Sequence, residues 1–383
     1  MVNVVLRLIY NGFITKFLRL GSLINTALVF WNFYCIVSIM SVSIRDVALK
    51  AGVSLGTVSN AFNRPGALAP ATLKKVQKAV AELGFVPNAS ARTLRAGKTR
   101  VLGLVVPDIS NPFFTDLSKG VNDAVLAAGY VVILCNTDES SEKEDKYLDV
   151  LTSQNVQGIL ITPARDSYSN LKTITDRGIG LTLVDRIAVG LEACSVGVDD
   201  AQGGALALNH LTDLGHRKIL LLTGAENIPQ VAEREKGIKE AIRKSSASDR
   251  PNLQTIRVDA MAAHSAEETL TKYLETNPLD FTGVICGNDL VALGAIRALR
   301  AKGIDVPGEV SVIGYDDIDF AQSASVPLTS IAQPKYQLGF AAAQLAIEEC
   351  ENPTKHTHQR IEFQPQLIVR SSTSPVSKKS KGI

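Results

Sequence analysis

Hydrophobic residues follow two different spacings along this chain of 383 residues. Between residues 43 and 97, apolar side chains recur every three or four positions, which is the spacing of one face of an α-helix. From Val101 onward, strand-length runs of Val, Ile and Leu alternate with segments of helical spacing. Near-continuous apolar runs of this kind are typical of parallel strands covered by helices on both faces. The pattern therefore predicts an all-α module followed by an α/β body.

The predicted elements of the body are too numerous for one sheet. The predicted strands are residues 101–107, 130–135, 157–162, 180–185, 218–223, 282–287 and 310–315. The predicted helices include residues 114–128, 142–154, 201–214, 231–244, 266–275 and 290–302. We expect these elements to form two Rossmann-like lobes, each with its own parallel sheet.

Residues 43–59 have the pattern of two short helices joined by a tight turn. Ser43 can cap the first helix, because Asp46 three residues later supplies the carboxylate of a capping box. Gly52 stands where the turn needs a positive φ angle, which Gly adopts without steric cost. Ser54 can cap the second helix. The spacing fits a DNA-reading helix-turn-helix, and an ordinary helical hairpin is the alternative on this run alone.

The residues that follow favour the helix-turn-helix. Pro70 suits the first turn of a third helix, an apolar stripe at helical spacing comes next, and Gly84 ends the helix. A short basic segment follows over residues 88–96, with a lone apolar residue at Leu94.

With these motifs in place, the chain resembles the lactose-repressor (LacI/GalR-type) family of bacterial transcriptional regulators. The resemblance covers residues 43–371, and its motifs occur in the family's order. They are DVALKAGVSLGTVSNAFN, GFVPNASARTLRAGKT, LGLVVPDISNPFF, CGNDLVALGA, SVIGYDDI and LTSIAQP. The resemblance implies a periplasmic-binding-protein-like body in which the chain crosses between the lobes near residues 195–200, 331–333 and 363–364.

Charge is divided unevenly along the chain. Residues 41–100 carry ten Lys and Arg against two acidic residues, whereas the body is acidic, and the overall net charge is only +2. A compact basic module indicates a nucleic-acid partner. The five cysteines show no Cys-x-x-Cys or Cys/His spacing, so we expect no metal site, disulfide framework or cofactor, and a reducing cytoplasm fits. The histidines lack metal-ligand spacing too and are interpreted as structural or solvated: His210, His216, His264, His356 and His358.

The second helix of the module is the predicted recognition helix. Leu55, Gly56 and Asn60 are expected to face base edges. Asn60 can pair with an adenine through two hydrogen bonds, whereas Gly56 cannot reach a base. Relatives often carry a longer polar residue and an Arg at these two positions, so their half-site preference does not carry over. The other residues assigned to DNA binding are Ser43, Ser54, Thr57 and Asn63 as phosphate contacts, with capping as the alternative for the hydroxyls, and Ser59.

By resemblance, residues 88–96 are the family's hinge helix, which pairs with that of a second protomer in the minor groove. Leu94 matches the leucine that wedges into a base step and bends the duplex. Asn88 and Arg92 are assigned to DNA binding as well. The alternative for Leu94 is a linker residue that packs on the body.

Ligands of doubly wound folds bind at the carboxyl ends of the strands. The resemblance implies that the effector site is formed by Asn111, Phe113 and Asp185 of the first lobe, Arg234, Asn288 and Asp316 of the second, and Gln333 at a crossing. This mix suits a sugar or related polyol, because carboxylates and amides pair with adjacent hydroxyls. Asp138 is an open candidate, and Asp289 is expected to cap a helix instead.

We therefore expect a homodimeric, cytoplasmic, sequence-specific regulator of transcription, most often a repressor in this family, whose affinity for operator DNA depends on a small-molecule effector. No nucleophile with a base and an orienting partner appears, so catalysis is not expected. The alternative is an exported or membrane-tethered solute-binding protein, because residues 22–40 form a long uncharged stretch. A tether conflicts with DNA binding, so we expect a functional start at Met40 and no membrane association.

These expectations divide the chain into five parts. They are a hydrophobic extension outside the working protein (1–40), a helix-turn-helix domain (41–87), a hinge helix and linker (88–100), a two-lobe effector-binding and dimerisation domain (101–371) and a disordered polar tail (372–383).

Overall fold

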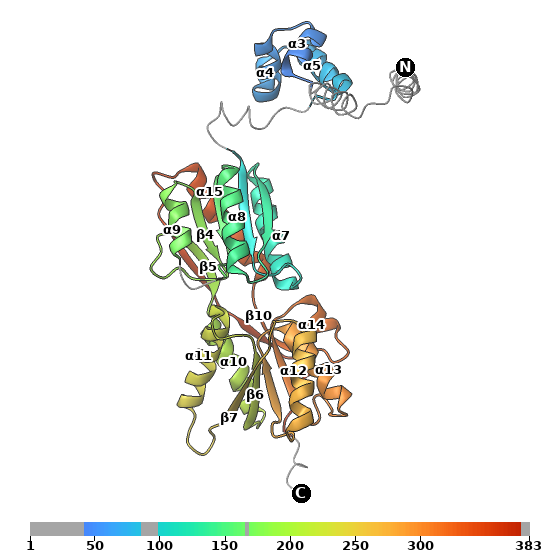
Figure 1. Cartoon of the computed structure of the whole chain (residues 1–383), viewed down its shortest axis with the longest axis vertical. Helices are drawn as coiled ribbons and strands as arrows, with labels where there is room; N and C mark the ends of the chain where they lie inside the picture. The colour runs from blue at the N-terminus through green and yellow to red at the C-terminus, as the bar shows by residue number, and fades with distance from the viewer. Residues whose placement is uncertain (1–41, 86–98, 165–167, 377–383) are drawn as a thin grey trace, which may run out of the picture. The chain divides into compact units, whose positions relative to one another are not determined.

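The computed structural model describes residues 42–85, 99–164 and 168–376 (Figure 1). The chain forms two compact units, residues 1–97 and 98–383, which are described separately. The expected extension over residues 1–40 and the expected hinge over residues 88–96 lie outside the described residues. None of the helices in the described ranges is long and apolar enough to cross a membrane.

The N-terminal unit is built from short, well-capped helices. They are α3 (Ile44–Ala51), α4 (Leu55–Asn63), the 3-10 turn η1 (Pro65–Ala67) and α5 (Pro70–Leu83). The predicted capping box is confirmed, since the Ser43 N–H donates to the Asp46 carboxylate at 2.8 Å. Gly52 ends α3 at φ 65°, and Ser54 caps α4. Val47, Val58 and Val76 form the buried centre of this unit, one from each α-helix.

Lobe 1 of the body is an all-parallel sheet covered by helices on both faces (Figure 1). Its strands are β1 (Val101–Val106), β2 (Val131–Asn136), β3 (Gly158–Ile161), β4 (Gly180–Val184), β5 (Cys194–Val198) and β11 (Arg360–Phe363), in the order β11-β5-β4-β3-β1-β2. Its helices are α7 (Pro112–Ala127), α8 (Ser141–Ser153), α9 (Ser169–Asp176) and α15 (Lys335–Glu351).

Lobe 2 repeats this architecture. Its strands are β6 (Lys218–Thr223), β7 (Asn252–Arg257), β8 (Gly283–Cys286), β9 (Ser311–Asp316), β10 (Thr329–Ala332) and β12 (Gln366–Ile368), in the order β12-β10-β9-β8-β6-β7. Its helices are α10 (Asp200–Asp213), α11 (Pro229–Lys244), α12 (Ala263–Thr276), α13 (Asp289–Ala301) and α14 (Asp319–Ser323). Only β12 runs antiparallel to its neighbour, β10. The predicted pair of Rossmann-like lobes is confirmed.

The chain crosses between the lobes where the sequence predicts. The first crossing joins β5 to α10, the second joins β10 to α15, and the third joins β11 to β12. Lobe 1 is therefore completed by two elements, α15 and β11, that follow the main part of lobe 2 in the chain.

Glycine lets neighbouring helices of each lobe approach closely. A Cβ at Gly120 of α7 would lie 2.1 Å from the Tyr336 carbonyl oxygen of α15. A Cβ at Gly237 of α11 would lie 1.8 Å from the Ala201 carbonyl oxygen of α10. Any side chain at either position would force the two helices apart.

The C-terminal segment differs from the expectation of a disordered tail from residue 372. Ser372 is fully buried, accepts a hydrogen bond from the Thr329 N–H at 2.8 Å and donates to the Val312 carbonyl at 2.6 Å. The Val376 N–H donates to the Leu214 carbonyl at 2.9 Å. The expectation is wrong for residues 372–376, because their polar groups pair with the strands and loops of lobe 2; residues 377–383 lie outside the described residues.

Candidate DNA-binding face and effector cleft

The predicted base-reading residues lie on the exposed side of α4. Val58 is buried in the core of the unit, while Leu55, Gly56 and Asn60 are exposed. Leu55 keeps 45% of its surface accessible, which is high for a large apolar side chain in so small a unit. This face of α4 is therefore free to enter a groove.

The predicted phosphate-binding hydroxyls are occupied as caps. Ser43 Oγ donates to the Asp46 carboxylate at 2.7 Å. Ser54 Oγ accepts from the Thr57 N–H at 3.1 Å and lies 2.9 Å from the Thr57 hydroxyl. In α4, Asn63 Nδ2 donates to Ser59 Oγ at 3.2 Å. The predicted contacts Asn88, Arg92 and Leu94 lie outside the described residues.

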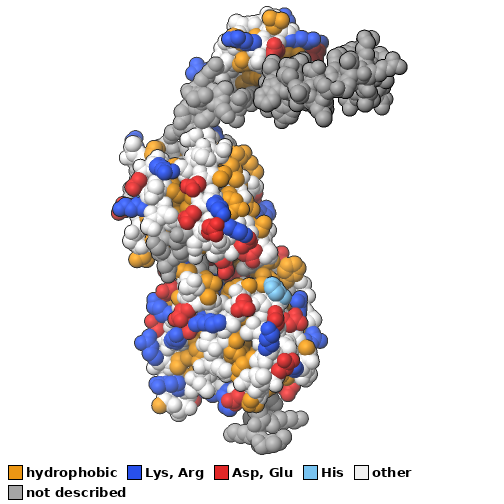
Figure 2. Space-filling view, viewed as in Figure 1, with side chains coloured by type: hydrophobic (Ala, Val, Ile, Leu, Met, Phe, Trp, Pro, Cys, Tyr) orange, Lys and Arg blue, Asp and Glu red, His pale blue; other side chains and the backbone are white. Residues whose placement is uncertain are grey.

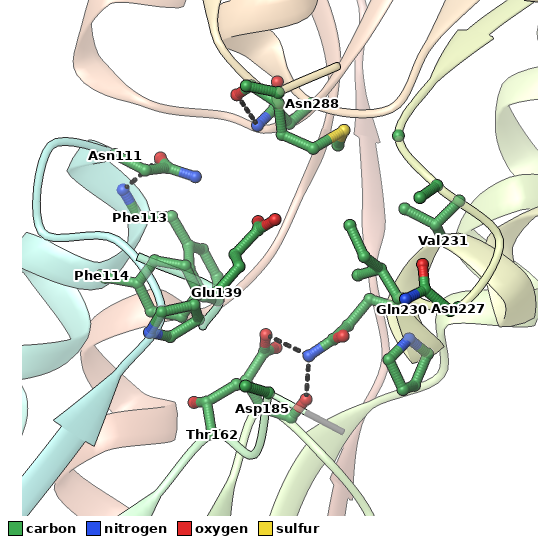
Figure 3. A pocket seen from close by; sticks show the side chains of 18 of the residues that line it. Asn111, Phe113, Phe114, Glu139, Thr162, Asp185, Asn227, Gln230, Val231 and Asn288 are labelled. Atoms are coloured by element: carbon green, nitrogen blue, oxygen red, sulfur yellow. Dashed lines mark hydrogen bonds between the residues drawn. The ribbon is translucent and has the colours of Figure 1, made fainter. Parts of the chain in front are cut away.

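In the body, a cavity of about 260 Å³ opens between the two lobes at the carboxyl ends of their strands (Figure 3). This volume lies just below the range of about 300–1,000 Å³ that is typical of small-molecule sites. Six of the seven predicted effector residues line it: Asn111, Phe113, Asp185, Arg234, Asn288 and Asp316. Gln333 is buried and pairs with Asp316, so it acts on the cavity through that carboxylate.

The loop from β1 into α7 supplies the apolar wall. Asn111 caps α7 by accepting from the Phe113 N–H at 3.0 Å. The rings of Phe113 and Phe114 meet edge to face with centroids 4.9 Å apart, and both line the cavity. The cap fixes the start of the helix and with it the position of the two rings.

Asp185 follows β4 in a left-handed conformation, with φ 57°. Gln230, at the start of α11 in lobe 2, donates to both the Asp185 carbonyl at 2.9 Å and its carboxylate at 3.0 Å (Figure 3). Burial, reinforced by the charge of Asp200, raises the pKa of Asp185 to about 8, against the opposing effect of Arg234. Gln230 therefore bridges the lobes on a buried carboxyl group whose protonated form is favoured.

Arg234 is held rigidly from lobe 2. Its Nε donates to Asp200 at 2.7 Å, its Nη1 donates to the Gly287 carbonyl at 2.7 Å, and its guanidinium lies 3.6 Å from the centre of the Tyr315 ring. Burial alone would lower the pKa of Arg234, but Asp200 and Tyr315 raise it above its ordinary value. The guanidinium is therefore a fixed cation at the cavity wall.

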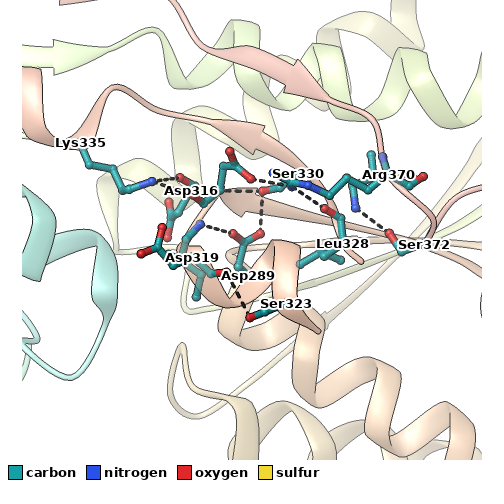
Figure 4. A network of polar contacts seen from close by, with 12 residues as sticks. Asp289, Asp316, Asp319, Ser323, Leu328, Ser330, Lys335, Arg370 and Ser372 are labelled. Carbon is teal, nitrogen blue, oxygen red and sulfur yellow. Dashed lines mark hydrogen bonds and ion pairs between the residues drawn. The ribbon is translucent and has the colours of Figure 1, made fainter. Parts of the chain in front are cut away.

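Asp316 ends β9 with φ 100° and is almost fully buried. Gln333 Nε2 donates to its carboxylate at 2.8 Å, and Lys335 donates to its carbonyl at 3.2 Å (Figure 4). Burial raises the pKa of Asp316 to about 6, although Arg234 and Gln333 oppose the shift. Both partners belong to the second crossing, so Asp316 is coupled to a segment that joins the lobes.

Asn288 takes the capping role expected of its neighbour Asp289, in addition to its expected place at the cavity. Asn288 caps α13, accepting from the Val291 N–H at 2.8 Å, and also lines the cavity. The Asp289 carboxylate accepts from the Ile318 N–H at 2.8 Å and from the Ser330 hydroxyl at 2.6 Å (Figure 4). The expectation that Asp289 is a cap is wrong, because its side chain joins the loop after β9 to β10.

Asp138 does not line the cavity. Its carboxylate pairs with Lys143 and with the Asn136 amide. The next residue, Glu139, lines the cavity in its place (Figure 3). Sequence reasoning also missed Gln230, because it stands outside the family motifs. The remaining polar lining residues that it missed are Thr162, Asn227 and Asp259.

Comparison with known proteins identifies the family. A family model described as bacterial regulatory proteins, lacI family, matches residues 43–88, and one described as a periplasmic binding protein-like domain matches residues 208–373. The transcriptional regulator DegA of Bacillus subtilis is 34% identical over 341 residues, which cover 88% of this chain and 100% of that protein. This chain belongs to the LacI family.

Two further regulators resemble this LacI-family protein. The transcriptional repressor PurR of Photobacterium profundum is 34% identical over 345 residues, covering 88% of this chain and 99% of that protein. The structure of a LacI-family regulator from Enterococcus faecium with bound ribose is 30% identical, with a TM-score of 0.64, and covers 72% of this chain and 100% of that chain. The LacI-family chain described here is thus a DNA-binding transcriptional regulator, and the solute-binding alternative is not supported, because it does not account for the matched DNA-binding module.

Proposed function

We propose that this LacI-family regulator represses transcription, and that its affinity for operator DNA changes when a sugar or related polyol binds between the lobes. The cavity that brings Asp316, Arg234 and Asn288 of lobe 2 against Asn111 and the phenylalanines of lobe 1 carries the proposal. Carboxylate, amide and guanidinium groups pair with neighbouring hydroxyls, and an aromatic edge packs on the apolar face of a sugar ring. The similar E. faecium regulator holds ribose.

The protonation states support a polyol. Asp316 is a hydrogen-bond acceptor when ionised. Arg234 stays protonated and is a donor throughout the pH range in which the protein is folded. Burial raises the pKa of Asp185 well above its ordinary value, which favours the protonated form that can donate as well as accept. A sugar hydroxyl can bind a hydrogen-bond donor and an acceptor at once. These three residues supply both kinds of partner to an uncharged ligand.

The proposed switch is lobe closure. An effector that contacts both lobes favours the closed arrangement by its difference in affinity for the closed and open forms. The Gln230–Asp185 bridge and the crossing residues Gln333 and Lys335 are the contacts that such a movement alters. In this scheme residues 41–87 read the operator, residues 88–100 couple the units, and no step requires catalysis.

We infer that the working protein is a homodimer joined through lobe 1. Edge strand β2 exposes Val131, Ile133 and Leu134, each more than 40% accessible. The equivalent edge strand of lobe 2, β7, exposes Asn252 and Gln254 instead. Figure 2 shows hydrophobic side chains gathered on lobe 1. An apolar edge of this kind is a liability unless a partner covers it.

The proposed effector site is tested with Asp316→Asn. Calorimetric titration with ribose and a panel of pentoses, hexoses and nucleosides first identifies a ligand of the wild-type protein. Asn tolerates the left-handed backbone but removes the charge, so we expect affinity to fall at least tenfold, about 1.5–3 kcal/mol.

The matched control is Asp138→Asn. The backbone of Asp138 also has a positive φ angle, of 50°, and its carboxylate pairs with Lys143 outside the cavity. This variant should leave effector affinity unchanged. Equal affinities in wild type and Asp316→Asn would place the effector elsewhere.

A further inference from the structure

A second cluster of polar side chains lies in lobe 1, at the opposite end of the sheet from the cleft. Cys194 is the first residue of β5, Glu349 lies in the last turn of α15, and His356 and His358 lie in the segment that leads into β11. One ligand atom from each of the four lies within 4.8 Å of all the others. Cys194 and the stretch of residues 349–358, which are far apart in sequence, therefore converge on one point.

The spacing of these atoms fits a tetrahedral metal ion. Cys194 Sγ lies 3.0 Å from His356 Nε2 and 3.8 Å from His358 Nδ1. With zinc–ligand bonds of about 2.0–2.3 Å, tetrahedral geometry separates neighbouring ligand atoms by roughly 3.3–3.8 Å. Small side-chain adjustments bring all four atoms to these separations.

Two atoms of the cluster lack a hydrogen-bond partner among the described residues. They are Glu349 Oε2 and His356 Nδ1, and both are buried. The His356 side chain is only 1% accessible. Leaving such groups unpaired is costly, because burial removes the water that would otherwise bind them. A cation beside Glu349 removes the penalty on its unpaired, buried carboxylate oxygen.

The surroundings of the cluster are those of a metal site. The Glu348 carboxylate lies 3.9 Å from His356 Nδ1, on the side of the ring away from Cys194. Histidines that bind metal through one ring nitrogen usually donate the other N–H to a carboxylate. The Gln359 N–H points at Cys194 Sγ from 3.4 Å, which stabilises a thiolate.

We propose that Cys194, Glu349, His356 and His358 form a closed site for Zn²⁺. One sulfur, two imidazoles and one carboxylate make a ligand set typical of zinc, and softer than Mg²⁺ or Ca²⁺ would select. On binding, the zinc–sulfur bond replaces the S–H bond of Cys194, and the proton leaves to solvent. Since four protein ligands leave no open position, the ion ties α15 to β5 and β11 and activates no water.

The test uses the full chain, freed of metal with a chelator and titrated with Co²⁺ as a spectroscopic stand-in for Zn²⁺. We expect intense visible bands of tetrahedral cobalt and a thiolate-to-cobalt charge-transfer band, both removed by one equivalent of Zn²⁺. Cys194→Ser should abolish the charge-transfer band, while Cys135→Ser, at another buried cysteine of the same lobe, should keep it.

A second variant tests the site in the event that Cys194→Ser does not fold. His358 is exposed, so His358→Ala should fold normally and weaken zinc binding at least tenfold, measured by competition with a chelating dye. His264→Ala, an exposed histidine of lobe 2, is the control and should bind zinc as wild type does. A charge-transfer band that persists in Cys194→Ser, only weak octahedral bands, or unchanged zinc affinity in His358→Ala would each overturn the proposal.

Discussion

Asn60 is the residue of the recognition helix best placed to discriminate between bases. It is exposed on α4, and its amide can form two hydrogen bonds with an adenine. Asn60→Ala is expected to cost about 1–3 kcal/mol at one base pair of each half-site and to leave nonspecific binding unchanged. Mobility-shift titration against operator variants at fixed salt measures this loss. A uniform loss across all sequences would show a phosphate contact instead.

Asp185 links the stability of the body to pH. Its carboxyl group titrates with a pKa of about 8 in the native protein, and of roughly 4 in the unfolded chain. Between these values the native state holds more protons than the unfolded state, so stability falls as pH rises through this window. Asp185→Asn cannot ionise and should be more stable than wild type at pH 8, by on the order of 1–3 kcal/mol, with little difference near pH 4.

Urea denaturation at both pH values measures the effect. Asp138→Asn serves as the control, since Lys143 lowers the pKa of that exposed carboxylate and no gain at pH 8 is expected. A pH-independent gain in Asp185→Asn would point to packing as its cause.

Features that depend only on neighbouring residues, such as helix caps and tight turns, were predicted well from the sequence. The caps Ser43 and Ser54 and the turn at Gly52 depend on neighbouring residues, so their roles can be seen in a few letters of sequence. Asn288 and Asp289 could not be separated in this way. Both residue types are good N-caps. The contact of the Asp289 carboxylate with the loop after β9 leaves Asn288 to cap α13, and this contact cannot be seen in the sequence.

At the level of elements, Gly52 is what allows α3 and α4 to join in so tight a turn. It adopts φ 65°, and no atom lies within 4 Å of the position that a Cβ would occupy, so a substitution meets backbone strain alone. Gly52→Ala should destabilise the N-terminal unit by about 1 kcal/mol. Hydrogen exchange of the α3–α5 amides in the full chain should then quicken about fivefold.

Gly66 offers the matched control for this element. It also has open space around its Cβ position, but its φ angle is not in the left-handed region. Gly66→Ala should leave exchange nearly unchanged. Equal effects of the two substitutions would mean that strain at the turn is not the cause.

Strands were predicted where they are fully apolar and missed where they are not. The fully buried strands β3 and β8 stand out as runs of Val, Ile and Leu. Strand β7 reads Asn-Leu-Gln-Thr-Ile-Arg and is half exposed at the sheet edge, so its pattern is that of a surface segment. Only its pairing with β6 makes it a strand.

For the whole molecule, the apolar edge of lobe 1 predicts how two copies associate. Ile133→Asp places a charge in the middle of the exposed strand β2, and a buried unpaired charge is strongly unfavourable. We expect this variant to be monomeric in sedimentation experiments and to lose at least tenfold in operator affinity. Gln254→Asp on β7 is the control, and should remain dimeric. A dimeric Ile133→Asp protein would place the interface on another surface.

The cleft shows why a site is harder to predict than a fold. Its lining combines residues from both lobes. The family resemblance pointed to Asp316, which ends strand β9, and to Arg234, which lies in helix α11. Gln230, at the start of α11, and Glu139, in the loop after β2, belong to different lobes, and only the fold brings them to one cavity. The four-residue cluster around Cys194 is hidden for a similar reason, since only the fold brings Cys194 to Glu349, His356 and His358.

The order in which lobe 1 is completed affects how the protein folds during its synthesis on the ribosome. Helix α15 packs on α7, with Gly339 of α15 close to Leu117 and Val121 of α7, yet residues 199–332 are made in between. At about 5–20 residues per second, that delay is on the order of ten seconds. Throughout it, the face of α7 that α15 covers in the folded protein stays exposed, so we expect the nascent chain to be prone to aggregation until α15 emerges.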